Sequence, residues 1–210
     1  MKVAIVYREE SDHARAVIDF KRDYQRQTGR ELTTVDPESP DVIADTLAPL
    51  LVAVLRLLVV PLIVASAAMR LGNAEYWDLL DDLNLAVHEA GHLVFQPLGD
   101  HAMTIGGSLF QVLVPLAFAG YFLARRQRFA ASVVMAWVAI NLLNVAHYIG
   151  DARAQELPLL GGENAIHDWW YLLTEWDLLP HDVSIARAVR AAATLAWVVA
   201  GGGALAFARE

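Results

Sequence analysis

The chain of 210 residues is long enough for one domain or slightly more. Hydrophobic residues make up 56% of it and the mean hydropathy is +0.37, which favours a membrane protein over an ordinary soluble domain. The absence of cysteine excludes disulfide bonds, thiolate ligands and cysteine nucleophiles, so any metal site must use histidines and carboxylates. A net charge of −8 without a basic tract argues against a nucleic-acid partner.

The first 40 residues are predicted to form a small β-α-β segment. Strands are expected at Lys2–Tyr7 and Glu31–Val35, with a helix at Asp12–Gln27 between them. This order resembles the opening of a thioredoxin-like or other α/β fold, although Cys-x-x-Cys is absent. Because so small a unit buries too little surface to fold alone, we interpret residues 1–40 as a remnant or an appended cytoplasmic piece, with a linker at its end, Glu38-Ser39-Pro40. The charged, strand-like start is unlike a cleavable signal peptide.

Residues 41–210 are predicted to form a helical membrane domain, so the expected fold class is mainly α, a multi-pass bundle. Four apolar stretches are long enough to cross a bilayer, which takes about 20 helical residues. They are Leu47–Ala68, Gly106–Ala124, Phe129–Ile149 and Ala188–Phe207. Gly201-Gly202-Gly203 in the last stretch predicts close approach of a neighbouring helix.

The most informative stretch is His88-Glu89-Ala90-Gly91-His92, within a helix expected at about Leu83–Phe95. Residues four apart project from one helical face, so the two imidazoles can take two corners of a tetrahedral zinc site. Glu89 lies beside them, where it can act as general base on a zinc-bound water. The helix is short for a full span, so a re-entrant or interfacial helix packed in the bundle is expected. The alternative is a helix whose histidines only hydrogen-bond to neighbouring helices.

Polar residues also gather at the end of the third apolar stretch. Asn141, Asn144 and Asp151 share a helical face, and His147 lies four residues before Asp151. Ionisable groups in a membrane helix normally face the bundle interior and mark a site. Asparagines in the same position often make interhelical hydrogen bonds instead, and both interpretations remain open for Asn141 and Asn144.

The predicted site needs another ligand, because a catalytic zinc takes three protein ligands and keeps one open position. We predict Asp151 as the third ligand beside His88 and His92, with His167 as the runner-up and His147 next. The residues expected to orient an imidazole or the substrate carbonyl, or to steady its oxyanion, are Asn144, Asp168 and Arg153. The remaining histidines, without a partner pattern, are His13, His101 and His181.

A membrane-embedded His88-Glu89-x-x-His92 helix, followed by spans with a late aspartate, is similar to the site-2-type intramembrane zinc metalloproteases. The resemblance covers residues 47–207. It implies that His88, His92 and Asp151 bind zinc and that Glu89 activates water. The aspartate of that family usually stands in an Asp-Gly motif, whereas Asp151 here follows Gly150.

The distribution of lysine and arginine predicts the orientation in a cell (plasma) membrane. Four spans plus an inserted motif helix place the N-terminus, the loop at Arg125–Arg128 and the C-terminus on one side, with most of the basic residues. The positive-inside rule makes that side cytoplasmic. The candidate site residues then converge on the non-cytoplasmic side, together with Arg70, Arg153 and Arg187.

These features predict an integral-membrane zinc metalloprotease, which hydrolyses peptide or membrane-protein substrates with a zinc-activated water. One alternative is a membrane-embedded metal hydrolase that acts on lipid or amide substrates with the same ligands. The other is a non-enzymatic membrane scaffold, which predicts no bound zinc.

Overall fold

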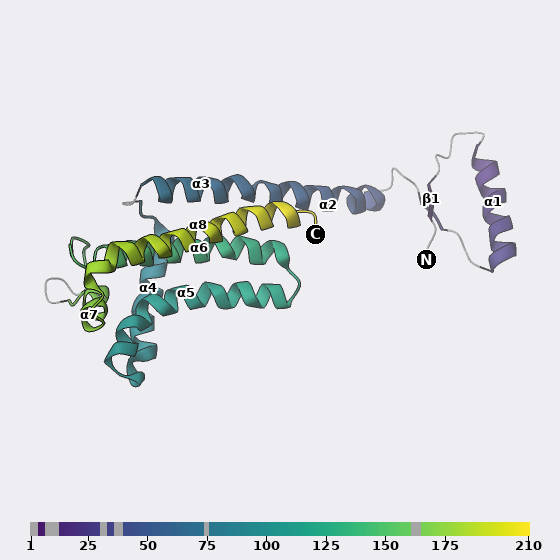
Figure 1. The fold of residues 1–210 in the computed structure, drawn as a ribbon. Coiled ribbons are helices and arrows are strands. Elements are labelled where there is room, and N and C mark those ends of the chain that lie inside the picture. Colours follow the sequence, from purple (N-terminus) through teal and green to yellow (C-terminus); the bar gives the residue numbers. More distant parts are fainter. Residues whose placement is uncertain (1–3, 7–12, 30–32, 36–39, 74–75, 161–164) are drawn as a thin grey trace. The chain divides into compact units, whose positions relative to one another are not determined.

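The computed structural model describes residues 4–6, 13–29, 33–35, 40–73, 76–160 and 165–210. Helices dominate the chain (Figure 1), and four of them are long and apolar enough to cross a membrane. The predicted class, mainly α with about four membrane-length helices, is therefore confirmed. The chain divides into two compact units, residues 1–54 and residues 55–210, which are described separately.

Among its described residues, the first unit consists mainly of helix and has two short strands. Its α1 (His13–Thr28) lies in the chain between β1 (Ala4–Val6) and β2 (Thr33–Val35), which pair in parallel. Strands of three residues make no sheet layer on which a helix can bury a core, so the predicted β-α-β segment is not supported as a fold unit. Most of the expected linker at 38–40 lies outside the described residues, and α2 (Pro40–Leu57) begins at its last residue.

The four membrane-length helices follow the predicted stretches. They are Leu47–Gly72, made from α2 and α3 (Val59–Gly72); α5 (Asp100–Ala124); α6 (Arg128–Gly150); and Leu179–Phe207, made from η3 (Leu179–His181) and α8 (Asp182–Phe207). Large apolar side chains point outward along them, such as Leu62, 67% exposed, and Val198, 66% exposed. Such a surface is costly in water and favourable in lipid.

Small residues pack α6 against α8 over their whole length. Ala139 of α6 and Ala193, Ala200 and Ala204 of α8 are fully buried in this interface. A Cβ on Gly203 would collide with the side chain of Ser132, so the helices approach closely there. The predicted role of the glycine run in close packing therefore applies to Gly203, because open space faces the other two glycines.

The motif lies on α4 (Leu79–Phe95), whose 17 residues are too few for it to count among the membrane-length helices. Asp78 caps its N-terminus and forms a capping box with Asp81. The buried Arg70 at the end of α3 donates to both oxygens of Asp81 at 2.8 and 2.7 Å and to Asp78 Oδ2 at 2.6 Å. Asn144 of α6 also donates to Asp81 Oδ1, at 2.8 Å. This network fixes the start of the motif helix against two neighbouring helices.

Two glycines bring α4 and α5 into backbone contact. A Cβ on Gly91 would collide with the carbonyl oxygen of Gly106 and would lie 2.7 Å from Cβ of Phe110. A Cβ on Gly106 would lie 2.7 Å from Cβ of Phe95. Gly91, inside the motif, is therefore required by helix packing, and the crossing sets how far the motif histidines extend toward α5.

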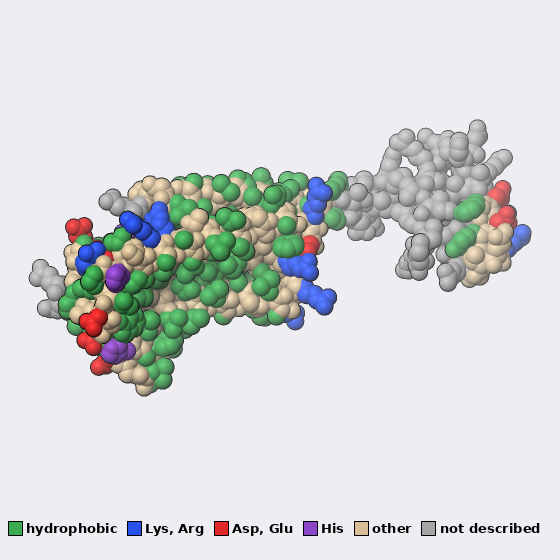
Figure 2. Space-filling model, viewed as in Figure 1, with side chains coloured by type: hydrophobic (Ala, Val, Ile, Leu, Met, Phe, Trp, Pro, Cys, Tyr) green, Lys and Arg blue, Asp and Glu red, His purple; other side chains and the backbone are tan. Residues whose placement is uncertain are grey.

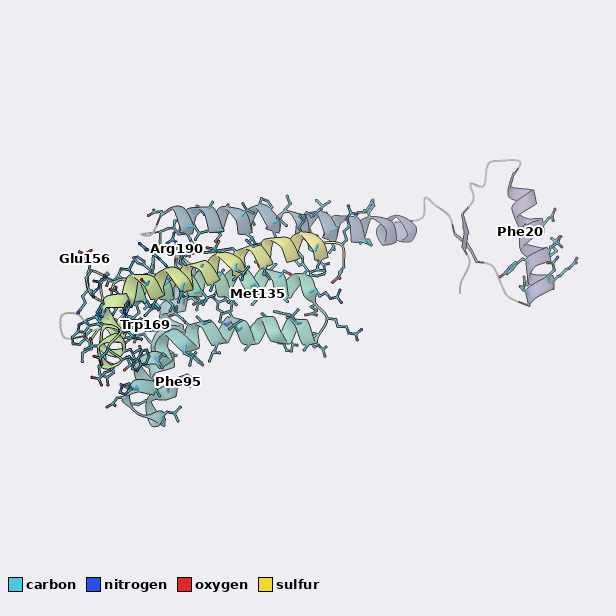
Figure 3. The ribbon with its side chains drawn as sticks, viewed as in Figure 1. Phe20, Phe95, Met135, Glu156, Trp169 and Arg190 are labelled. Carbon is cyan, nitrogen blue, oxygen red and sulfur yellow. The ribbon has the colours of Figure 1, made fainter. Side chains whose placement is uncertain are left out.

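Charged side chains gather at both ends of the second unit. Lysine and arginine side chains mark the end with the α5–α6 turn, whereas the opposite end carries acidic, histidine and further arginine side chains, with mostly hydrophobic side chains between the two ends (Figure 2). At the end with the α5–α6 turn, Arg128 pairs with Glu210 at 3.0 Å. The opposite end carries the short α7 (Asp168–Glu175), which includes Trp169, labelled in Figure 3; Glu156, also labelled there, lies at the same end.

Candidate metal centre

The helical spacing of the motif brings His88 and His92 together, with ring centroids 4.7 Å apart. His88 is buried, and its Nδ1 lies 2.8 Å from Oε1 of Gln111 on α5. His92 Nδ1 lies 2.9 Å from the carbonyl oxygen of Met103. Both acceptors favour a proton on Nδ1, which leaves each Nε2 with a lone pair for a metal.

The two Nε2 atoms face one carboxylate, that of Asp168 at the start of α7. Asp168 Oδ2 lies 3.1 Å from Nε2 of His88 and 3.3 Å from Nε2 of His92. Among the described residues, these three side chains form the group of histidines and acids that could hold a metal ion. Asp168, which we predicted as an orienting residue, is thus the carboxylate that lies against the two histidines, whereas Asp151, the predicted third ligand, is not part of this group.

The two distances from Asp168 match both a hydrogen-bonded imidazole–carboxylate group and the edge of a tetrahedral metal site. Nitrogen and oxygen ligands lie about 2.0–2.1 Å from a tetrahedral zinc, so two ligand atoms lie about 3.3 Å apart. The two distances from Asp168 Oδ2, 3.1 and 3.3 Å, agree with that edge length. Two imidazoles and one carboxylate, each imidazole held by a second acceptor, are also the donor set of catalytic zinc sites.

Gly107 of α5 lies directly against both imidazole rings. A Cβ at this position would lie 2.6 Å from Nε2 of His88 and 2.7 Å from Cε1 of His92. Any side chain here would push the rings away from Asp168. Glycine at this position therefore keeps space for the convergence of the two histidines.

The carboxylate of Asp168 and the imidazole of His92 each have a shifted pKa. The hydrogen bond to Asp168, against the opposing effect of burial, raises the pKa of His92 to about 9. Burial alone would raise the pKa of Asp168, but hydrogen bonds and charge from His88 and His92 outweigh it and lower that pKa. The site therefore favours positive charge beside the carboxylate, which is the electrostatic environment of a cation site.

Glu89 and the histidine pair line one cavity of about 1440 Å³, and Glu89 itself is exposed. The cavity wall also carries Asn144, His147, Tyr148, Asp151 and Asp168. Carboxylate and imidazoles thus share a space large enough for substrate and water.

Asp151 and His167, the predicted third ligand and its runner-up, lie together beside this group. His167 Nε2 lies 3.3 Å from Asp151 Oδ2, without the alignment of a hydrogen bond. Both Asp151 oxygens accept backbone N–H groups, from Glu156 at 3.0 Å and Leu157 at 3.1 Å. Burial lowers the pKa of His167, against the opposing effect of Asp151.

The other predicted residues have separate partners. His147 lines the cavity but is exposed and lies outside the group that could hold a metal. Asn144 donates to Asp81, and Asn141 donates to Asn84 at 3.3 Å, which is the interhelical alternative raised for both asparagines. Arg153 forms an ion pair with Asp182 through two contacts of 2.8 Å, so its guanidinium has a structural partner. His101 and His181 are exposed, and the side chain of His13 lies outside the described residues.

Sequence reasoning missed several residues of the site. Gln111 holds His88, Gly107 makes room for both rings, and Tyr148 accepts the backbone N–H of Asp168 at 3.1 Å. A signal for Tyr148 was present, because it continues the helical face of Asn141, Asn144 and Asp151. No local pattern marks Gly107 as a residue that faces histidines on another helix.

Comparisons with known proteins add no relative. No family model, no curated protein and no solved structure matches the chain.

Proposed function

We propose that this chain is a membrane-embedded zinc hydrolase, in which His88, His92 and Asp168 hold the metal and Glu89 is the general base. The observation that carries the proposal is the approach of both imidazole Nε2 atoms to one oxygen of Asp168. Zinc, when bound, lowers the pKa of its water toward 7 and polarises a carbonyl group.

The protein's own groups then have distinct tasks. Gln111 and the Met103 carbonyl hold the two imidazoles in the tautomer that leaves Nε2 free. Glu89 adjoins the ligand His88 in the chain and faces the same cavity, where it takes the proton of the attacking water and passes it to the leaving group. Such a proton transfer contributes about 10²–10⁴-fold to a rate.

We propose peptides or membrane-protein segments as the substrates. The cavity of about 1440 Å³ beside the histidine pair has room for an extended segment of polypeptide. The four membrane-length helices support a location in a membrane. For the orientation we keep the prediction from the positive-inside rule, which takes the end with Arg125, Arg126 and Arg128 as cytoplasmic and places the site at the other end.

The proposal is tested with the full chain purified in detergent. We expect one zinc per chain by elemental analysis of the wild-type protein, and we expect His92→Ala and Asp168→Asn to bind zinc more weakly and to be purified with less than one zinc per chain. His101→Gln is the matched control, because His101 is an exposed histidine outside the group. Absence of zinc from the wild-type protein under zinc-replete conditions would refute the metal assignment and favour a scaffold.

The role of Glu89 is tested by Glu89→Gln, which is nearly isosteric and leaves the three ligands in place. We expect this variant to keep zinc and to lose at least about 100-fold in hydrolysis. The assay is a panel of fluorogenic and membrane-spanning peptides, with a lipid panel run in parallel. Hydrolysis of lipid alone would assign the alternative substrate class, and wild-type turnover in the variant would remove the base assignment.

A further inference from the structure

A buried aspartate–histidine pair lies beside the candidate metal centre without belonging to it. The side chain of His167 has no exposed surface, and that of Asp151 is 8% exposed. Burying an ionisable pair costs free energy unless its contacts repay it. His167 is adjacent in the chain to Asp168, so the contacts of the pair bear directly on the carboxylate of the site.

His167 begins the helix that carries Asp168. It is the N-cap residue of α7, and its Nδ1 accepts the backbone N–H of Trp170 at 3.2 Å. Its other ring nitrogen faces Asp151 at 3.3 Å. Since α7 has 8 residues, far below the roughly 12–15 that an isolated helix needs, its start depends on such contacts.

Asp151 joins this cap to the end of α6. Its two oxygens accept the N–H groups of Glu156 and Leu157, which fixes the loop that leaves α6. The same carboxylate faces His167, so loop and helix start meet at one side chain.

Tyr148 holds the other side of the same turn. Its ring lies against that of His167, with centroids 4.2 Å apart, and its hydroxyl accepts the backbone N–H of Asp168 at 3.1 Å. The main chain of Asp168 is thus fixed at its own N–H and at the residue before it.

We infer that Asp151, His167 and Tyr148 are positioning residues that hold Asp168 against the histidine pair and so set the affinity and geometry of the metal site. The inference rests on the proposed function, because it concerns the same zinc. It also gives Asp151, which we had expected to bind the metal, the role of holding the residues that position Asp168. Outer contacts of this kind are worth about 10–100-fold in metal affinity.

The test measures zinc affinity of the full chain in detergent by competition with a chromophoric chelator. We expect His167→Ala and Tyr148→Phe each to weaken zinc binding by about 10–100-fold. His167→Asn restores a good N-cap and should recover part of the loss. Arg153→Lys is the matched control, because Arg153 lies in the same loop after α6 but pairs with Asp182. The zinc affinity of this variant should equal that of the wild type.

A double-mutant cycle separates positioning from general damage. Once Asp168→Asn has removed the carboxylate ligand, adding Tyr148→Phe should change the residual affinity less than about threefold. Cobalt in place of zinc gives a second readout, since its visible absorption should change in Tyr148→Phe and remain wild-type in Arg153→Lys. Tyr148→Phe removes one oxygen only, so it keeps the test valid even where His167→Ala fails to fold.

The outcomes are distinguishable. A wild-type protein that binds no zinc overturns the proposed function and this inference with it. A wild-type protein that binds zinc, with unchanged affinity and cobalt spectrum in Tyr148→Phe and His167→Asn, overturns this inference alone. Equal losses with and without the Asp168 ligand also overturn it, because they show a general loss of stability.

Discussion

Replacing Gly107 by alanine should disable the metal site while leaving the bundle folded. The added Cβ would lie 2.6–2.7 Å from atoms of both imidazoles, whereas ordinary contact begins near 3.4 Å. The rings must therefore move by about 0.7 Å, and metal sites tolerate errors of only about 0.2 Å in ligand distances. The free energy of unfolding should change less, because moving the imidazole rings costs little and alanine has about 1 kcal/mol more helix propensity than glycine.

We therefore expect zinc affinity to fall at least about 100-fold in Gly107→Ala, with a change in the free energy of unfolding below about 2 kcal/mol. The assays are chelator competition and thermal unfolding of the detergent-solubilised chain. Gly120→Ala is the control on the same helix, because no atom lies within 4 Å of its new Cβ. Wild-type zinc affinity in Gly107→Ala would refute the placement of the two histidines over this glycine.

Three further predictions concern proton release, a buried ion pair and helix packing. Zinc affinity should rise about tenfold per pH unit from pH 7 up to about 9 and then level off. The reason is that zinc must displace the proton of His92, whose pKa is raised to about 9. Calorimetry in buffers of different ionisation enthalpy measures how many protons are released when zinc binds. Arg70→Met should destabilise the fold by about 3–5 kcal/mol in thermal unfolding, because it strands the buried Asp81 carboxylate, and a second change, Asp81→Asn, should recover part of the loss. Gly203→Ala should lower the unfolding temperature because its methyl group meets a serine of α6, whereas Gly202→Ala, facing open space, should not.

Periodicity and length predicted the helices because both depend on local sequence. The stretch at Leu47–Ala68 needed only its apolar length, and the motif helix needed only its spacing of histidines. The structure contains both, as Leu47–Gly72 and Leu79–Phe95. The β-α-β interpretation had less basis, because short apolar runs do not distinguish a fold unit from an isolated pair of strands.

The choice between Asp151 and Asp168 depended on three-dimensional information that the sequence does not carry. Both aspartates lie at the same end of the bundle, so topology and the charge rule treat them alike. Helical periodicity favoured Asp151, because it follows the asparagines of α6. The start of α7 turns Asp168 toward the histidines instead, and Asp151 is occupied by backbone N–H groups and His167. A lone acid on a two-turn helix gives no periodic signal.

The alanine interface between α6 and α8 determines which parts of the protein can rearrange. A methyl group has no alternative rotamers, and Gly203 already lies against the Ser132 side chain, so this pair of helices behaves as a rigid unit, the α6–α8 spine. In the proposed function, entry of a polypeptide therefore depends on movement of the other elements that line the cavity, such as α7. Crosslinks across the spine should leave turnover intact, whereas a crosslink from α7 to α4 should arrest it.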